Sequence, residues 1–164
     1  MKAKINVNSY LIFKIEDERF AALADNIVNI LGYQHITKVP KAPIYMKGVI
    51  NLRGTVLPVI DTRIKFDMNP TEFTDKTCIV VLDLKVNGEI IHIGALVDSV
   101  DSVYKIAKNN IEETPNIGTG YRSEFITGIA TVDKDFVMIL DLVKLFTMDE
   151  ITCLKKSNKK QITN

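Results

Sequence analysis

The sequence predicts a single all-β domain, on three observations. Isoleucine and valine supply 37 of the 164 residues, and their branched Cβ atoms fit a pleated strand better than a helix. About ten short apolar segments alternate with turn residues, at the spacing typical of a barrel or sandwich. The hydrophobic fraction of 46% and the charged fraction of 25% are ordinary for one globular domain. With no repeat at a fixed period and no linker in evidence, we expect one domain over 1–148 and a basic, disordered tail over 149–164.

The N-terminal segments predict a hairpin and then a short helix. The apolar runs 9–15 and 20–23 flank a charged turn, as the two strands of a hairpin do. Asp25 is a good N-cap for a helix over 25–31, and Gly32 suits its C-terminal end. One face of that helix would carry Ile27, Ile30 and Leu31.

The remaining segments predict three further hairpins, a lone strand over 99–106 and a last helix. The first hairpin, over 48–61, turns at 52–55, where Gly54 can adopt positive φ, and Pro58 marks an edge or a bulge. The second turns at Asn87-Gly88, and the third at Asp133-Lys134-Asp135. Asp141 can cap a short helix over 141–147.

The charge pattern argues against a nucleic-acid partner. Four of the 21 basic residues lie in the tail, so Met1 to Leu154 carries 17 basic and 20 acidic residues and lacks a basic face. No apolar run is long enough to cross a membrane, and the N-terminal segment lacks a signal-peptide core. Cys78 and Cys153 have no second thiol or histidine at ligand spacing. We therefore expect a cytoplasmic protein without nucleic acid, membrane insertion or metal.

Candidate catalytic residues are few. Asp61, Asp98 and Asp141 each follow an apolar strand, and a pair of them could in principle do acid–base work. Aspartates at strand ends more often accept backbone N–H bonds or cap helices. His92 lies within an apolar strand and is expected to be a residue of the barrel wall. We expect neither enzymatic activity nor a cofactor, and keep a small β-barrel enzyme using Asp61 and Asp98, and an OB-like oligonucleotide binder, as competing hypotheses.

The stretch GVINLRGTVLPVIDTRIKF over 48–66 resembles the signature of the chemotaxis coupling protein family, CheW. Further similarity lies in YLIF at 10–13, in IVNIL at 27–31, in ALVDSV at 95–100 and in the segment from 125 to 146. The tail after about residue 148 falls outside the resemblance. The matching signature positions are Gly48, Asn51, Leu52, Arg53, Gly54, Pro58, Asp61 and Arg63.

The resemblance implies two intertwined, five-stranded SH3-like barrels packed on a shared apolar core. It also implies a non-enzymatic adaptor that couples the cytoplasmic tips of chemoreceptors to the regulatory domain of a histidine autokinase in signalling arrays. A CheW-like paralogue that serves a different receptor and kinase system is the alternative.

The resemblance also implies the site residues. A receptor tip is a helical coiled coil, so its apolar side chains would dock in a groove between the barrels. Receptor-binding positions would be Ile27, Asn29, Ile30, Gly48, Arg53 and Val103, and kinase-binding positions would be Leu52, Gly54 and Val56. Gly48 matches a position where the backbone needs a close approach.

Position 29 departs from the family pattern. Many members carry an acidic residue there, and this chain has Asn29. If the family acid pairs with the residue that matches Arg53, the helix over 25–31 and the turn at 52–55 should meet in the folded domain. Asn29 would then replace a charge-assisted pair with a neutral hydrogen bond.

Overall fold

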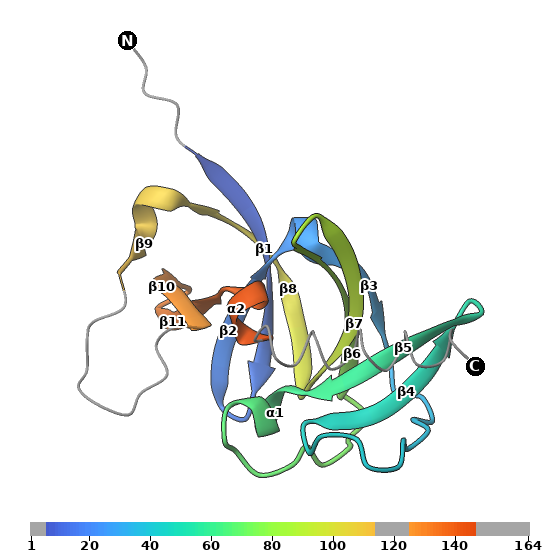
Figure 1. Ribbon diagram of the computed structural model, residues 1–164. Helices are drawn as coiled ribbons and strands as arrows, with labels where there is room; N and C mark the ends of the chain where they lie inside the picture. The colour runs from blue at the N-terminus through green and yellow to red at the C-terminus, as the bar shows by residue number, and fades with distance from the viewer. Residues whose placement is uncertain (1–5, 114–124, 147–164) are drawn as a thin grey trace.

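Two β-sheets hold most of the described chain (Figure 1). The computed structural model describes residues 6–113 and 125–146. The strands are β1 (Val7–Ile15), β2 (Glu18–Leu23), β3 (Ile27–Leu31), β4 (Met46–Leu52), β5 (Thr55–Asp61), β6 (Cys78–Val86), β7 (Glu89–Val97), β8 (Ser99–Ala107), β9 (Ile111–Glu112), β10 (Ile126–Val132) and β11 (Asp135–Leu140). Four short helices are η1 (Ala24–Asn26), α1 (Thr62–Lys65), η2 (Lys108–Asn110) and α2 (Leu142–Leu145). The predicted all-β class is confirmed.

The two sheets are built from interleaved parts of the chain. The six-stranded sheet has the order β8-β1-β2-β11-β10-β9, and the five-stranded sheet has the order β3-β6-β7-β5-β4. The N-terminal β1–β2 hairpin joins the late β10–β11 hairpin through a parallel pairing of β2 with β11. The β6–β7 hairpin joins the early β4–β5 hairpin through a parallel pairing of β7 with β5. The predicted intertwining is therefore present, with the two-residue β9 as a sixth strand in one sheet.

An internal repeat, which the sequence analysis did not detect, relates two of these hairpins. The segment β4–β5–α1 recurs 80 positions later as β10–β11–α2. Both copies have a β-bulge just before a glycine, Gly48 in the first and Gly128 in the second. Both end on an aspartate whose N–H donates to an aromatic residue's carbonyl at 2.8 Å, Asp61 to Tyr45 and Asp141 to Phe125. The fold thus has a pseudo-two-fold arrangement in which each half completes the other half's sheet.

Three apolar clusters explain why some strands are hydrophobic at every position. One cluster lies within the six-stranded sheet and includes Tyr10 and Ile12. A second lies within the five-stranded sheet and includes Ile79 and Val81. The largest, which we call the shared core, lies between the sheets and takes the alternate residues of the same strands. Because β1 and β6 are buried on both faces, they appear in the sequence as near-continuous apolar runs. The members of the shared core include Leu11, Phe13, Ile15, Phe20, Val80, Leu82, Leu84, Phe125, Leu142 and Leu145.

The predicted helix over 25–31 is wrong. A single 3-10 turn, Ala24–Asn26, is followed by strand β3, and the Asp25 side chain caps no helix. Within β3, Ile30 pairs with Val80 of β6. Three of the five residues of β3 are β-branched, so the strand pairing available from β6 prevails over a helical spacing only two turns long. Gly32 does not have the positive φ that a glycine at the C-terminal end of a helix adopts.

The other turn predictions are confirmed. Type I′ turns with two residues at positive φ lie at Asn87-Gly88 and at Asp133-Lys134. Asp141 caps α2 by accepting from the Lys144 N–H at 3.1 Å. The predicted edge or bulge at Pro58 is wrong, because β5 lies between β7 and β4 and the bulge falls at 46–48 on β4. Pro58 instead lies just before β5 begins to pair with β7 at Val59, where a residue without an N–H is tolerated. The tail over 149–164 lies outside the described residues.

Candidate binding surfaces

The β4–β5 turn presents Arg53 on a rigid support. The Gly54 N–H donates to the Asn51 side-chain oxygen at 2.8 Å, and this bond closes the turn from within. Arg53 and Gly54 both adopt positive φ, at 53° and 84°, as a type I′ turn requires. The Arg53 side chain is exposed and makes no hydrogen bond or ion pair with any described residue. The signature asparagine and glycine thus hold the turn, and the arginine between them is free to meet a partner.

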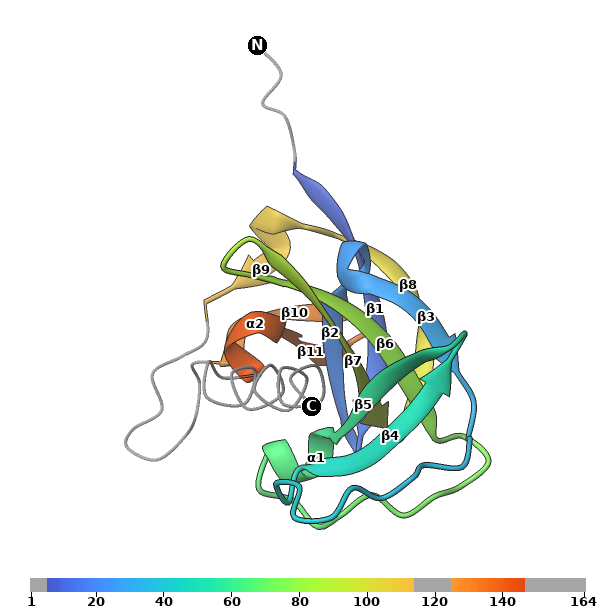
Figure 2. The same cartoon turned by 45° about the vertical axis from the view of Figure 1, so that its right-hand side comes forward.

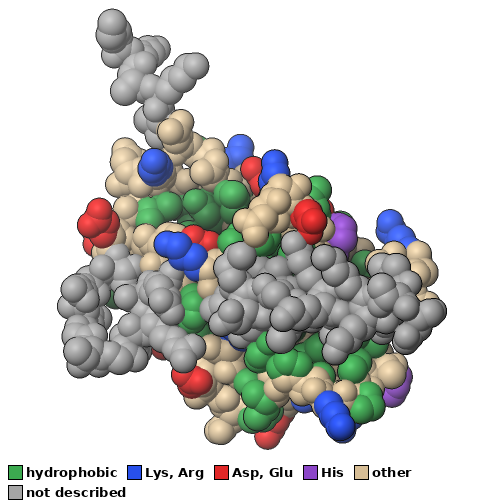
Figure 3. Space-filling view, in the orientation of Figure 1, with side chains coloured by type: hydrophobic (Ala, Val, Ile, Leu, Met, Phe, Trp, Pro, Cys, Tyr) green, Lys and Arg blue, Asp and Glu red, His purple; other side chains and the backbone are tan. Residues whose placement is uncertain are grey.

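The predicted kinase-binding residues lie on or beside this turn. Leu52 is half-buried and packs against the core of the five-stranded sheet, whereas Gly54 is exposed. Val56 is 64% exposed, and its cross-strand partner is Asn51. Figure 1 shows the β4–β5 turn extending beyond the body of the molecule, and in Figure 3 hydrophobic side chains gather over the region of β4 and β5. Of the three residues, Val56 is the one whose side chain can reach a partner.

The apolar residues predicted for the receptor lie along the border of the shared core. Ile27 packs against that core, and Ile30 is cross-strand to Val80, one of its members. On the other sheet, Val103 of β8 is cross-strand to Leu11, another member. Cross-strand partners share a face of the sheet, so all three side chains are on the side of the shared core.

Two of these side chains remain accessible to a partner. Ile30 is 41% exposed and Val103 is 58% exposed, while Ile27 is half-buried. Their strands β3 and β8 are edge strands of different sheets and lie on the same side of the molecule (Figure 2). We call Ile27, Ile30 and Val103 the rim. The rim is therefore built from both sheets, which no single segment of the sequence could reveal.

Two predicted receptor residues have local structural roles instead of exposed contacts. Gly48 is buried, and a Cβ at this position would lie 2.2 Å from the Thr37 carbonyl oxygen. That approach exists because Thr37 and Val49 exchange two backbone hydrogen bonds, at 2.8 and 2.9 Å. The predicted close backbone approach at Gly48 is therefore present. The Asn29 side-chain oxygen accepts from the Ile30 N–H at 2.8 Å.

The expected pairing of the side chains at positions 29 and 53 is not formed among the described residues. Among the described residues, no hydrogen bond or ion pair joins Asn29 to Arg53. The expectation rested on a helix at 25–31, and that segment is instead a strand paired with β6. Asn29 and Arg53 are therefore separate elements of the surface.

The candidate acid–base aspartates are both engaged in structural bonds. Asp61 is fully buried and accepts from the Arg63 N–H at 3.1 Å, from the Thr71 N–H at 3.0 Å and from the Thr71 hydroxyl at 2.7 Å. Asp98 accepts from the Arg63 guanidinium, with Nε at 3.0 Å from both oxygens and a terminal nitrogen at 2.7 Å. Because their oxygens accept these bonds, Asp61 acts as a helix cap and Asp98 as the ion-pair partner of Arg63, and the two do not form a catalytic pair.

Arg63 is the residue whose role the sequence reasoning missed. Its hydrogen bond with Asp98 and the nearby charges of Asp98 and Glu16 raise the pKa of its guanidinium, although burial acts in the opposite direction. Arg63 therefore remains charged at every pH at which the protein would be handled. The D-x-R ending of the signature contains this arginine, but its partner lies 35 positions later and only the fold brings the two together.

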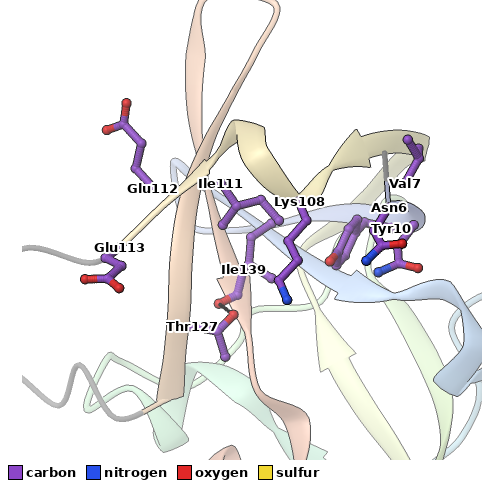
Figure 4. A pocket seen from close by; sticks show the side chains of 10 residues that line it. Asn6, Val7, Tyr10, Lys108, Ile111, Glu112, Glu113, Thr127 and Ile139 are labelled. Carbon is purple, nitrogen blue, oxygen red and sulfur yellow. Dashed lines mark hydrogen bonds between the residues drawn. The ribbon is translucent and has the colours of Figure 1, made fainter. Parts of the chain in front are cut away.

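A hollow with a volume of about 780 Å³ lies at the open end of the six-stranded sheet (Figure 4). Tyr10 and Ile139, both from the core of that sheet, form part of its lining. The Lys108 side chain extends across it, while Glu112 and Glu113 point away (Figure 4). Of the polar groups in this lining, the Thr127 hydroxyl donates to the Ile139 carbonyl at 3.3 Å.

The described residues contain neither a metal-ligand grouping nor a membrane-spanning helix. Over 6–113 and 125–146, no three His, Cys, Asp or Glu residues are grouped as a metal ion would need. No helix in those ranges is both long and apolar enough to cross a membrane. His92 lies on the wall of the five-stranded sheet, as expected, and pairs with Asp83 across the β6–β7 hairpin. Burial raises the pKa of the Cys78 thiol, which disfavours the reactive thiolate, and Cys153 lies outside the described residues.

Comparisons with known proteins agree with this architecture. The profile of the CheW-like domain matches residues 9–150. A probable chemotaxis protein CheW from Rhizobium etli is 33% identical over 140 residues, which cover 85% of this chain and 88% of the relative. Chemotaxis protein CheW from Thermotoga maritima is 30% identical over 142 residues, covering 87% of this chain and 88% of the relative. The solved structure of the scaffolding protein TtCheW from Thermoanaerobacter tengcongensis matches with a TM-score of 0.75 and 28% identity, covering 88% of this chain and 96% of that one. The chain therefore belongs to the CheW-like domain family.

Proposed function

We propose that the protein is a non-enzymatic chemotaxis scaffold that joins the cytoplasmic tip of a chemoreceptor to the regulatory domain of a histidine autokinase. It would act in the cytoplasm, recruited to membrane-associated receptor arrays. The observation that carries the proposal is the rim, where two sheets present exposed branched side chains beside one shared core. The names of the relatives support the chemotaxis context, and that of the solved structure supports a scaffolding role.

The rim suits a helical partner. A helix hairpin presents apolar side chains at every third or fourth position, and Ile30 and Val103 offer accessible apolar contacts on two strand edges. The polar residue Asn29 has its oxygen already engaged by the Ile30 N–H, so a partner would not leave that oxygen unpaired. In this proposal Gly48 contributes indirectly, because the approach of Thr37 to β4 sets the position of the β4–β5 hairpin.

The β4–β5 turn suits a compact globular partner. Val56 lies on β5 beside a turn that its own hydrogen bond already closes, so little conformational entropy is lost on binding. Arg53, in the same turn, is retained as a receptor-binding residue. We expect the kinase regulatory domain to make a small contact here, with a dissociation constant on the order of micromolar. A modest affinity is sufficient, because two weak contacts act together in an array. Calorimetry with the purified regulatory domain at high concentration should detect a heat of binding. The absence of any heat of binding would count against the contact.

The receptor surface is tested by Val103→Asp. An aspartate at the rim would have to be desolvated against apolar side chains, so we expect at least tenfold weaker binding to a purified receptor-tip hairpin, measured by titration. Ile90→Asp is the matched control, because Ile90 is also a branched, exposed residue, with 62% exposure, but it lies on β7 and is not part of the rim. Equal losses in both variants, or none in Val103→Asp, would remove the rim from the proposal.

We expect Arg53→Ala to weaken binding to the receptor tip or to the kinase regulatory domain about tenfold. The melting temperature should stay nearly unchanged, because the Arg53 side chain is exposed and forms no hydrogen bond or ion pair with a described residue. Lys134→Ala is a close control, since Lys134 also has positive φ in a type I′ turn, at 69°. Titration and thermal unfolding of both variants separate binding from stability. A double-mutant cycle of Arg53→Ala with Asn29→Glu should show additive effects, because no hydrogen bond or ion pair joins the Asn29 and Arg53 side chains among the described residues. Coupling between the two substitutions would show that a glutamate at position 29 reaches the turn.

A CheW-like paralogue serving another receptor and kinase is the second candidate. Asn29 favours it, because this chain lacks the acid that many family members have at that position. A receptor tip that binds Asn29→Glu much more tightly than the native protein would identify that tip as foreign to this chain.

A further inference from the structure

One of the two points where the described chain crosses between the sheets is a single residue. Asp98 lies between the last residue of β7, in the five-stranded sheet, and the first residue of β8, in the six-stranded sheet. Its N–H donates to the Lys14 carbonyl at 3.0 Å, and its carboxylate accepts from the Glu16 N–H. Asp98 is therefore bonded to the β1–β2 hairpin by its backbone and by its side chain.

Arg63 connects this junction to the end of β5 in the five-stranded sheet. It belongs to α1, which follows β5 directly, and its guanidinium contacts Asp98 through three short hydrogen bonds of 2.7 to 3.0 Å. The Glu16 carboxylate lies 3.8 Å away on the other side. The Arg63 and Asp98 side chains are only 20% and 16% exposed, so the pair is less screened than an ordinary surface pair.

The cluster adjoins a hollow at the α1 end of the molecule. The hollow has a volume of about 430 Å³, with a lining that includes Glu16, Arg63, Lys76 and Asp98. Apolar contacts also join the sheets at this end, where Phe20 of β2 stacks on Phe66 after α1 at 5.1 Å between ring centroids. Apolar packing is not directional, whereas a forked guanidinium–carboxylate contact fixes distance and angle. The charged cluster therefore adds a directional contact to the apolar packing at this end.

The Arg63 contact is not repeated in the second copy of the internal repeat. Eighty positions after Arg63, the equivalent residue of α2 is Val143, which is 37% exposed. A valine cannot form an ion pair, so this position of α2 offers no counterpart of the Arg63–Asp98 contact. Within the described residues, the charged contact therefore belongs to the α1 copy of the repeat.

We propose that Arg63, Asp98 and Glu16 form a positioning cluster that holds the two sheets at the angle needed to align the two halves of the rim. Ile30 comes from one sheet and Val103 from the other, so their spacing depends on that angle. The β4–β5 turn belongs to the five-stranded sheet alone, and its geometry does not depend on the angle. This inference rests on the proposed receptor-binding role of the rim.

The test compares Arg63→Met with Arg19→Met. Arg19 also pairs with an aspartate, Asp101 at 2.8 Å, but both residues belong to the six-stranded sheet, so the control removes an ion pair without uncoupling the sheets. Spin labels at Ile90 and Phe136, which are exposed residues of different sheets, report the distance between the sheets in a cysteine-free background. We expect the distance distribution to broaden in Arg63→Met and to stay unchanged in Arg19→Met.

Binding provides the second measurement. In Arg63→Met, affinity for the receptor-tip hairpin should fall about fivefold while affinity for the kinase regulatory domain stays unchanged, and Arg63→Lys should restore part of the loss. If Arg63→Met fails to fold, Asp98→Asn supplies the same test. Unchanged distances, or equal losses for both partners, would overturn the positioning role alone. A native protein that does not bind the tip would reject the proposed function, and the positioning role with it.

Discussion

Gly48→Ala should lower the free energy of unfolding by about 3 kcal/mol, one of the two largest effects expected for a single substitution in this chain. The added Cβ would lie 2.2 Å from the Thr37 carbonyl oxygen and 2.8 Å from an Ile36 methyl carbon, and the first of these is backbone that cannot rotate away. The φ of Gly48, at 154°, is also one that residues with a side chain rarely adopt. Urea unfolding followed by circular dichroism measures the loss.

Two other glycines provide controls for this prediction. Gly128, its counterpart in the repeat, would place a Cβ 2.4 Å from an Ile111 side-chain carbon and 2.8 Å from the Glu112 carbonyl oxygen, so Gly128→Ala should also be destabilising. Gly32 has no atom within 4 Å of the position of a Cβ, so Gly32→Ala should be close to neutral. Equal stability of Gly48→Ala and Gly32→Ala would show that the bridge to Thr37 does not form.

Asp61→Ala should cost about 3 kcal/mol of unfolding free energy, because it removes the acceptor for three donors around a fully buried carboxylate. The Thr71 N–H and hydroxyl would be left without a partner in the interior. Asp141→Ala is the matched comparison, since Asp141 occupies the same place in the repeat but is only half-buried. Thermal unfolding should show the smaller loss for Asp141→Ala, and the reverse order would contradict the roles assigned to the two caps.

The hairpins could be predicted from the sequence because their turn chemistry is local. Asn87-Gly88 and the turn at Gly54 each need positive φ, and residues that tolerate it occupy those positions. Strand β3 could not be predicted in the same way, since five residues with apolar positions at 27, 30 and 31 fit a helical spacing as well. Only the pairing with β6, some fifty positions later, decides the conformation of that segment.

The repeat escaped the sequence analysis because most of its positions have diverged. Gly48 and Gly128 are identical, as are Asp61 and Asp141, but the turn residues Arg53-Gly54 correspond to Asp133-Lys134. What the two copies preserve is geometry, namely a bulge, a type I′ turn and a capping aspartate. Each of these features lies within one hairpin and its following helix, so the repeat is recognised when the two hairpins of the folded structure are compared.

The candidate site was predictable in part. The family signature identified the β4–β5 turn, and the structure shows why its asparagine and glycine are needed. The signature could not identify the Arg63–Asp98 contact, because the two residues lie 35 positions apart and only the fold brings them together. Nor could it show that Ile30 and Val103 border one shared core, because these residues belong to different sheets. Nor could residue types alone distinguish a catalytic Asp61 from a buried cap.

Retention of the kinase regulatory domain on an immobilised receptor-tip hairpin tests the central claim most directly. The account predicts that the domain is retained only when this protein is added, and that Val103→Asp abolishes retention of both proteins. Val56→Asp should leave this protein on the tip but release the kinase domain, because Val56 is an exposed residue of β5 beside the β4–β5 turn and is not part of the rim. Retention of the kinase domain without this protein, or unchanged retention with both variants, would contradict a scaffold that joins the two partners through separate surfaces.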